Sequence, residues 1–463
     1  MVQDPRKHKE QLEQRFVSGK KHPMNKVSSQ QRPDAQDRDA WHSYWMARGQ
    51  PWRTEPEVDP ERQAYLAERR AIKPDLEQGI YPFKDIKLNR ADVEWLLATH
   101  MNGRGPVDWH EFRQFARAGI DLRGADLRGA DLRHLPLAHM LGGLSWQERD
   151  RTPERREMAA VHLEGAILSW AHLEGAELYM AYLSRADLYK AHLEGASLRK
   201  AHLEGASLRN AHLEGKFLFP RKQGARQNEG SMNMLPPANL RAAFFDSTTD
   251  LRNTSLGDDE QGFVLLADVH WEGVNLGVVD WAPVKMVGDE IRARRARDEE
   301  GKEKEKETRI HEYREAVRAN RQLAVALQQQ GLNEEAARFA YRAQLLQKKV
   351  LWQQRKLAAF LFSTILDLLA GYGYKPLRSL VAYLLVILSF AAVFYFLGQT
   401  AGPRLSPLGA LVFSTTSFHG RGLFPARVVV DDPITVLAAL EAVVGLAIEI
   451  SFIATFTQRF FGK

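Results

Sequence analysis

The chain has 463 residues, which is longer than one ordinary domain, so we expect two or three folding units. It contains no cysteine, which excludes structural disulfides and thiolate metal sites. The net charge of +6 is modest, and no basic stripe is interleaved with aromatic residues, so nucleic acid is not an expected partner.

The N-terminal part is polar. Residues 1–78 are rich in Gln, Arg, Lys, Asp and Pro, a composition that predicts a largely disordered or loosely helical arm. They contain no apolar core of the kind that a secretory signal needs, so we expect the chain up to about residue 375 to stay in the cytoplasm. Residues 79–119 are predicted to form a short helical cap, with a helix at 90–101 that begins after Asn89.

A five-residue period carried by leucine begins at Asp121. It is interrupted at about 138–160, where an inserted loop and helix are expected, and then resumes with an alanine two residues before each leucine from Ala166 through Ala211. The leucines are Leu122, Leu127, Leu132 and Leu137, then Leu163, Leu168, Leu173, Leu178, Leu183, Leu188, Leu193, Leu198, Leu203, Leu208, Leu213 and Leu218.

This period matches neither a helix nor a strand. A square coil fits it, because four pentapeptides then make one turn of about 20 residues with Leu and Ala pointing inward, and stacked turns pair their backbones. The repeat resembles the pentapeptide-repeat family, whose motif is A-(D/N)-L-x-x. The resemblance implies a right-angled β-solenoid over 120–282, with a second insertion at 219–237 and degenerate sides at Ala238-Asn239-Leu240, Ala267-Asp268-Val269 and Val274-Asn275-Leu276.

Helices are expected after the solenoid. Residues 283–309 are strongly charged and predict a solvated linker or helix. Residues 310–356 predict a helical hairpin, with helices at 310–330 and 333–356 around Gly331. The apolar stretch within 357–376 is too short to cross a bilayer and favours a helix lying along the inner leaflet.

Two segments are long and apolar enough to cross a membrane, 380–397 and 434–456. Lysine and arginine gather before the first span and after the second, which predicts cytoplasmic N- and C-termini in the plasma (inner) membrane. The segment between the spans contains an apolar stretch too short to cross. Because irregular backbone is tolerated at membrane depth only beside protein or water, it predicts a short helix that enters the membrane and returns as a loop lining a pore.

Residues 377–463 resemble the pore domain of two-transmembrane potassium channels, with TTSFHGRGLFP in the place of the family's T-T-V-G-Y-G-D-x-x-P. Anchored on Pro425, Ser417 takes the place of the filter threonine, and His419 and Arg421 fall on the two filter glycines. A potassium filter needs backbone conformations at these two positions that glycine permits and that residues with side chains disfavour, so a filter of another type is expected. The resemblance implies an ion pathway formed by Thr415, Thr416, Ser417, Phe418, His419, Gly420, Arg421 and Gly422.

Charges near this pathway conflict. Four copies of Arg421 would favour anions, unless Arg421 turns aside to pair with Asp431 or Asp432. His419 has the same two alternatives, and its protonation is a further means of tuning conduction. Glu449 is expected to line the inner pore and concentrate cations.

Two other residues of the second span have structural alternatives. Glu441 is expected to brace the pore helix rather than line the pathway. Gly445 is predicted to be a gating hinge, with close helix packing as the alternative.

The solenoid repeats also carry a ladder. His172, His192 and His212 lie twenty residues apart, so they should stack on one outward face, with Glu174, Glu194 and Glu214 beside them. A strip that binds metal or senses pH is one interpretation, and a surface ladder left by duplication is the other, which we favour. We therefore expect no metal site and no cofactor.

The sequence thus predicts a multidomain membrane protein that joins a cytoplasmic solenoid and a helical hairpin to a two-transmembrane pore-loop domain. Its predicted function is the pore-forming subunit of a homotetrameric ion channel, with membrane lipid and inorganic ions as partners and the solenoid serving gating or assembly. The alternative is a membrane-anchored scaffold that does not conduct; in either case the solenoid has room for an unknown cytoplasmic ligand or protein. No phosphate loop, HExxH motif or nucleophile elbow is present, so enzymatic activity is not expected.

Overall fold

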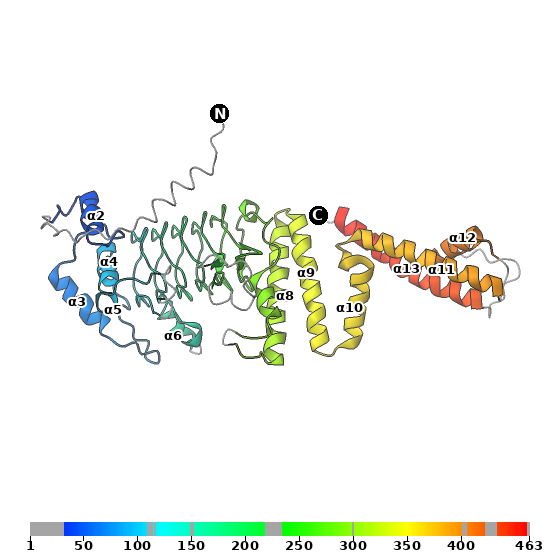
Figure 1. The fold of residues 1–463 in the computed structure, drawn as a ribbon, viewed down its shortest axis with the longest axis horizontal. Coiled ribbons are helices and arrows are strands. Elements are labelled where there is room, and N and C mark those ends of the chain that lie inside the picture. Colours follow the sequence, from blue (N-terminus) through cyan, green and yellow to red (C-terminus); the bar gives the residue numbers. More distant parts are fainter. Residues whose placement is uncertain are drawn as a thin grey trace, which may run out of the picture. The chain divides into compact units, whose positions relative to one another are not determined.

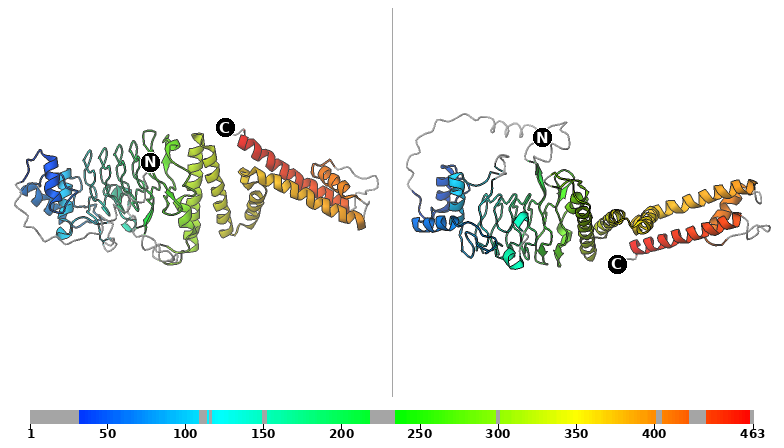
Figure 2. Two further views of the ribbon diagram at one scale, coloured as in Figure 1. Left: turned by 45° about the horizontal axis from the view of Figure 1, so that its top comes forward. Right: turned by 90° about the horizontal axis from the view of Figure 1, so that it is seen from below.

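A computed structural model of the chain describes residues 32–108, 114, 117–148, 152–217, 234–298, 301–400, 405–421 and 433–460. The chain divides into two compact units, Met1–Val58 and Asp59–Lys463. Figure 1 labels their helices along the colour gradient, and Figure 2 shows the same ribbon from two further directions.

The first unit holds one described helix, α2 (Arg38–Met46), which begins after the capping side chain of Asp37. Trp41 and Trp45 are buried and stack with their ring centroids 5.9 Å apart. The Arg53 guanidinium lies 3.5 Å from the centroid of the Trp45 ring. Of the two alternatives predicted for this arm, disorder is therefore wrong for residues 32–58, because a small aromatic cluster supplies a core that the average composition conceals.

The second unit begins with helices that cover the first solenoid coil, and the predicted disorder is also wrong for 59–78. The helices are α3 (Pro60–Arg70), α4 (Arg90–Ala98) and α5 (His100–Gly103). The predicted Asn89 cap of α4 is confirmed, because Asn89 and Asp92 form a reciprocal capping box. Arg90 is buried, pairs with Glu94 at 2.7 Å and donates to the Arg133 carbonyl oxygen at 3.0 Å. A side chain of α4 thus supplies a hydrogen bond to a backbone carbonyl at the open edge of the first coil.

The middle of the unit is a β-solenoid whose sides pair in parallel every twenty residues where the repeats are uninterrupted, as in the bridges from His172 to His192 and from His192 to His212. The repeat leucines from Leu122 through Leu213 and the alanines from Ala166 through Ala211 are at most 2% exposed and form the axial core, while Leu218 lies outside the described residues. At every corner from Gly165 through Asn210 one residue has a positive φ, including side-chain-bearing residues such as Met180 and Lys190. The square coil of twenty residues is therefore confirmed, and Figure 1 shows its stacked turns in cyan to green.

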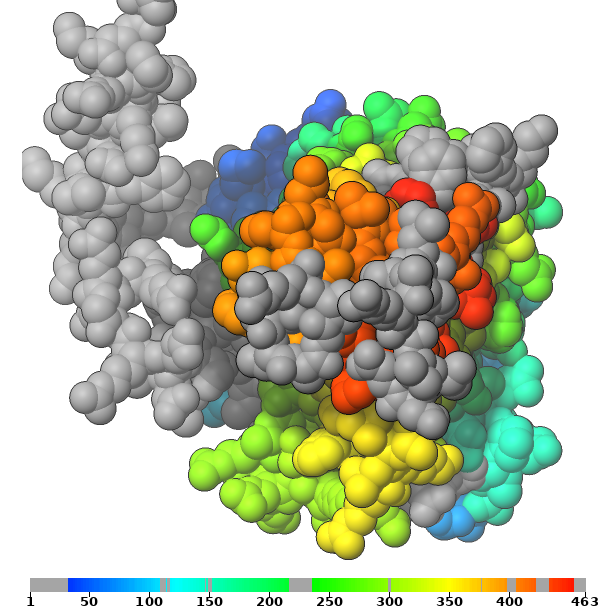
Figure 3. Space-filling model, turned by 90° about the vertical axis from the view of Figure 1, so that its right-hand side faces the viewer, coloured from blue at the N-terminus to red at the C-terminus, as the bar shows by residue number. Residues whose placement is uncertain are grey.

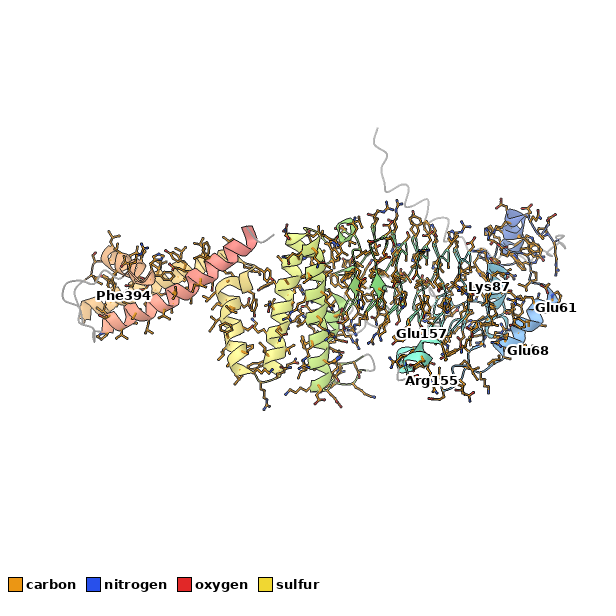
Figure 4. The ribbon with its side chains drawn as sticks, turned by 180° about the vertical axis from the view of Figure 1, so that it is seen from behind. Glu61, Glu68, Lys87, Arg155, Glu157 and Phe394 are labelled. Atoms are coloured by element: carbon orange, nitrogen blue, oxygen red, sulfur yellow. The ribbon has the colours of Figure 1, made fainter. Side chains whose placement is uncertain are left out.

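Two insertions interrupt the coil. The first begins after Leu141 rather than at 138, because Leu141 still bridges to Glu177. It contains η2 (Trp146–Glu148) and α6 (Pro153–Glu157), where Glu157 accepts a hydrogen bond from the Tyr182 hydroxyl at 2.7 Å. Figure 4 labels Arg155 and Glu157 on α6 beside the coils.

After the second insertion the repeats become irregular and form short strand pairs. Asn239 resumes the ladder under Ser197, as expected. The register predicted at Ala267-Asp268-Val269 is wrong, because Leu265 pairs with Asn239 and Asp268 stands at a corner with φ +62°. The strands are β1 (Lys216–Phe217) paired with β2 (Met234–Leu235), β3 (Phe244–Phe245) with β6 (His270–Trp271), and β4 (Gly257–Asp258) with β5 (Gly262–Phe263).

Helices close the C-terminal end of the solenoid. They are η4 (Leu276–Val278), α7 (Gly288–Arg294), α8 (Lys306–Gln329) and α9 (Asn333–Gln353), and α8 and α9 confirm the predicted helical hairpin. Asp289 of α7 is fully buried, accepts from Arg241 at 2.7 Å and takes the backbone N–H of Leu266 at 2.6 Å. The charged segment is thus partly a packed cap, which covers the last coil as a solenoid requires.

The remaining helices are α10 (Leu357–Ala370), η5 (Gly371–Gly373), α11 (Pro376–Thr400), α12 (Pro407–Phe418) and α13 (Pro433–Phe460). Two segments, Leu377–Leu397 of α11 and Pro433–Ile453 of α13, are long and apolar enough to cross a membrane. Only 17% of the first and 22% of the second is buried within the described chain. Figure 3 views this region from its end, with α11 and α12 in orange beside α13 in red.

Candidate functional site

The short helix α12 packs against both α11 and α13. It begins after Ser406, whose hydroxyl accepts from the Gly409 N–H at 3.0 Å. Phe413 meets Phe394 of α11 edge-to-face with centroids 4.8 Å apart, and Figure 4 labels Phe394. Phe418, at the other end of α12, is buried with Ile387 and Ile448.

The end of α12 is a Schellman motif. The Arg421 N–H donates to the Thr416 carbonyl oxygen at 2.8 Å, and the Gly420 N–H donates to the Ser417 carbonyl oxygen at 2.9 Å. Gly420 has φ +66°, the left-handed conformation that this motif needs. Gly420 therefore ends the helix.

This geometry changes the expected filter. Residues 415–418 are the last turn of α12, not an extended loop. Thr415 and Thr416 turn their hydroxyls back to carbonyl oxygens of their own helix, each at 2.9 Å. The filter geometry of the potassium-channel resemblance is thus not formed at these four positions, because their backbone follows the helix. Gly422, like Pro425, Asp431 and Asp432, lies outside the described residues, so the predicted pairing of Arg421 with either aspartate stays a prediction.

Gly445 lies where α13 crosses the end of α12. A Cβ atom at this position would stand 2.1 Å from the Phe418 carbonyl oxygen, far inside contact distance. Close packing is therefore a sufficient reason for glycine here. The gating hinge stays a prediction.

A buried polar contact joins α12 to both long helices. Ser414 and Glu441 are 0% exposed, and Ser414 Oγ is hydrogen-bonded to Glu441 Oε1 and lies 2.8 Å from the Ile387 carbonyl oxygen. A hydroxyl carries one hydrogen, so Ser414 donates fully to only one of these two oxygens at a time. The expected contact of Glu441 with the short helix is present in the structure.

A second polar cluster lies at the C-terminal end of α12. His419 Nδ1 contacts Glu449 Oε1 of α13 as an ion pair or hydrogen bond, and His419 Nε2 lies 3.2 Å from the Tyr383 hydroxyl of α11. The side chains of His419 and Glu449 remain about one-third exposed, at 38% and 34%. The structure thus brings together two of the predicted pathway residues, and Arg421, two residues after His419 in the chain, is exposed.

Two members of these clusters were not predicted. Ser414 and Tyr383 lie in apolar segments where a hydroxyl has few partners, and this was the signal available in the sequence. Their partners, Glu441 and His419, are distant in sequence, so the pairing follows from packing and not from any local spacing.

The solenoid carries the predicted histidine ladder. The imidazole rings of His172, His192 and His212 stack in parallel with centroids 4.9 Å apart. Each Nδ1 faces the glutamate two residues later: Glu174 at 2.9 Å, Glu194 at 3.3 Å and Glu214 at 3.0 Å. The stacking that we predicted is confirmed, but the glutamates are buried, at 0%, 2% and 9% exposure, and not solvated.

Comparison with known families identifies the solenoid. A family model described as "Pentapeptide repeats" matches residues 158–188 and 176–215, with eight copies. The solenoid is a pentapeptide-repeat domain. The comparison with curated proteins found no match.

Solved pentapeptide-repeat proteins are similar to this domain. HetL of the cyanobacterium Nostoc, described as involved in heterocyst differentiation regulation, is 25% identical over 33% of this chain and 52% of its own, with a TM-score of 0.18. The alignment thus spans about half the length of HetL. A protein of the Arabidopsis thaliana thylakoid lumen is 20% identical over 34% and 77% of the chains, with a TM-score of 0.16, and Rfr23 of Cyanothece is 22% identical over 35% and 87%, with a TM-score of 0.15.

A polar joint connects the helices after the pentapeptide-repeat domain to α11. Asp367 of α10 accepts from Lys348 of α9 at 2.5 Å, from the Tyr341 hydroxyl at 3.0 Å and from Arg378 of α11 at 3.1 Å. Burial favours a higher pKa for Asp367, but the Lys348 and Tyr341 hydrogen bonds and the nearby positive charges hold the pKa below its usual value. One ionised carboxylate therefore contacts the two helices on either side of α10.

Proposed function

We propose that this chain is the pore-forming subunit of a homotetrameric ion channel in the plasma membrane, with its pentapeptide-repeat domain in the cytoplasm for gating or assembly. The observation that carries the proposal is α12, a short helix packed between two helices of membrane-spanning length that ends at a cluster of ionisable side chains. Such a cluster at membrane depth is costly unless it faces water or a partner. A pathway between subunits supplies that water.

The exposed surface supports a membrane setting. On α11 and α13, large apolar side chains such as Leu385 and Val443 are exposed, at 59% and 68%. On α10, Leu361, Phe362 and Leu368 are 60%, 64% and 73% exposed, as a helix lying on the inner leaflet would require. Lipid and neighbouring subunits would cover this surface, which is too extensive for contact with water.

The charges suggest where ions would pass. One hairpin cannot enclose a pathway, whereas four copies around an axis would bring four sets of His419, Glu449 and Arg421 toward it. His419 pairs with Glu449, so Arg421 is the charge at the end of α12 that has no ion-pair partner among the described residues. The permeant ion is then decided by the balance between Arg421 and Glu449.

Ion flux from the purified full chain in liposomes tests the proposal. We expect flux that exceeds that of protein-free vesicles and that changes in Glu449→Gln, because this variant removes a charge beside His419. The matched control is Leu385→Ala on α11, which should leave flux unchanged because that side chain faces lipid. Vesicles that stay silent across pH, calcium and voltage would reject conduction and favour the membrane-anchored scaffold, in which the hairpin only holds the pentapeptide-repeat domain at the membrane.

A further inference from the structure

The pentapeptide-repeat domain has two histidine–glutamate ladders, and they differ in one respect. Ten residues separate His162 from His172, which is two sides of the coil, so the ladders lie on opposite faces. In the first ladder Ser184 stands between Glu164 and Glu204, and its hydroxyl donates to Glu204 at 3.1 Å. This serine keeps the two carboxylates of that ladder from occupying successive coils.

The second ladder has no such separator. Glu174, Glu194 and Glu214 occupy the same position in three successive coils, whose histidine rings stack 4.9 Å apart. Glu174 and Glu194 are 0% and 2% exposed, so water does little to screen them. Two like charges this close in a buried setting are unfavourable unless a proton or a cation compensates them.

One carboxylate oxygen of Glu174 lacks a hydrogen-bond partner among the described residues. Glu174 Oε1 accepts from His172 at 2.9 Å, but Oε2 of the same carboxylate is buried and has no hydrogen-bond partner among the described residues. Ligand atoms of Glu174, His192 and Glu194 all lie within 4.8 Å of one another. Glu174 therefore belongs to a cluster that holds one imidazole and two carboxylates.

We propose that Glu174, His192 and Glu194 bind a divalent transition-metal cation of the zinc class. Imidazole nitrogen and carboxylate oxygen are ligands that such cations accept, and their charge offsets that of the two carboxylates. The gap between His192 Nδ1 and Glu194 Oε1 is 3.3 Å, the longest of the five histidine–glutamate contacts described on the domain. Ligand atoms on a tetrahedral zinc ion, with bonds of about 2.0–2.2 Å, lie about 3.4 Å apart, so this pair is already spaced for a cation between them.

Such a cation would tie two successive coils together. Glu174 belongs to one coil and His192 and Glu194 to the next, so occupancy adds a link across the stacking interface that carries solenoid stability. This site is independent of conduction, because its ligands are all in the pentapeptide-repeat domain.

Zinc binding to the purified full chain, by competition with a chromogenic chelator, tests the site. We expect one site per chain whose affinity falls at least tenfold in Glu174→Gln and in His192→Ala. The matched control is Glu204→Gln, the same substitution at the equivalent position of the opposite ladder, which should bind zinc as the unaltered chain does. Equal affinity in Glu174→Gln and Glu204→Gln, or no binding by the unaltered chain, would overturn the proposal and leave a shared proton as the compensation.

A second measurement covers variants that fail to fold. Crystals of the unaltered chain grown with zinc should show its anomalous scattering between Glu174, His192 and Glu194. Zinc found only elsewhere would reject the site. Thermal unfolding of the unaltered chain should also shift upward with added zinc, since a ligand that binds only the folded state stabilises it.

Discussion

Gly445 lies in the middle of α13, where an added methyl carbon would stand 2.1 Å from the Phe418 carbonyl oxygen. We predict that Gly445→Ala destabilises the packing of α12 on α13 by about 1–3 kcal/mol, as overpacked cores do. Thermal unfolding of the detergent-purified chain measures this loss. If Gly445 acts only as a flexible hinge, the same variant would instead keep its unfolding temperature and change gating alone.

The control for this prediction is Gly409→Ala. Gly409 is also helical, in the first turn of α12, but the nearest atom to an added Cβ is the Ser406 hydroxyl oxygen at 3.1 Å. Alanine favours a helix over glycine by about 1 kcal/mol, so this variant should be neutral or slightly stabilising. Equal destabilisation in both variants would mean that the loss does not come from Phe418.

Ser414 and Ser417 allow a second comparison on the same helix. Ser414→Ala removes the partner of buried Glu441, which we expect to cost about 1–3 kcal/mol. Ser417→Ala, one turn on, removes a buried hydroxyl that has no partner among the described residues, so it should cost little or be stabilising. Unfolding of both variants in detergent measures the difference, and a larger loss from Ser417→Ala would contradict the assignment of this contact.

At the scale of the element, the first solenoid sides repeat one ion-pair geometry. In three consecutive Asp-Leu-Arg sides the arginine donates to the aspartate two residues earlier at 2.7 Å: Arg123 to Asp121, Arg128 to Asp126 and Arg133 to Asp131. The hydrogen bond from Arg128 lowers the pKa of Asp126 to about 2. Each ion pair joins two residues of the same side of the coil, next to the corner that ends that side.

This geometry predicts how Asp126 contributes at different pH. Its pKa in the folded chain, about 2, lies below the ordinary value of about 3.9, so ionisation favours folding above pH 4 and the contribution disappears as pH falls through 2. Because the arginine is exposed, Asp126→Asn should lower the free energy of unfolding by only about 0.5 kcal/mol at neutral pH. Unfolding curves between pH 7 and pH 2 should converge for the variant and the unaltered chain.

The control is Asp280→Asn, at an exposed aspartate that accepts a hydrogen bond from the Ala282 N–H. The difference in unfolding free energy between this variant and the unaltered chain should not disappear as the pH approaches 2. A constant difference for Asp126→Asn down to pH 2 would show that the loss comes from something other than the charge.

Periodicity predicted the regular coils because every side repeats the same local requirement, a buried leucine and a small alanine. The periodicity gave the wrong register at Ala267, although the sequence there still matches the motif. Leu265 is the residue that pairs with the preceding coil, because an irregular turn before it shifts the register. From the sequence we predicted that His419 and Glu449 both line the ion pathway, but not that they contact each other. We also missed that the helix continues through Phe418, although Gly420 carries the signal of a helix end.

For the whole molecule, the decisive feature is how the pentapeptide-repeat domain reaches the two long helices. The last coil is covered by α7 and α8, α9 pairs with α8, and Asp367 of α10 contacts both α9 and Arg378 of α11. Each step is a packed or ion-paired contact between helices. Under the proposed channel function, a conformational change in the pentapeptide-repeat domain would be transmitted to α11 through this series of contacts.

The selectivity of the proposed channel depends on Arg421, which is exposed just after the end of α12. Reversal potentials in asymmetric salt should move toward the cation equilibrium potential in Arg421→Asp, with the cation-to-anion permeability ratio rising several-fold, because each subunit of the proposed tetramer would then carry a negative charge in place of a positive one. Lys306→Asp, the same charge change at an exposed position on α8, should leave the reversal potential unchanged. A conducting Arg421→Asp channel with an unaltered reversal potential would remove Arg421 from the pathway, leaving Glu449, beside His419, as the charge that selects the ion.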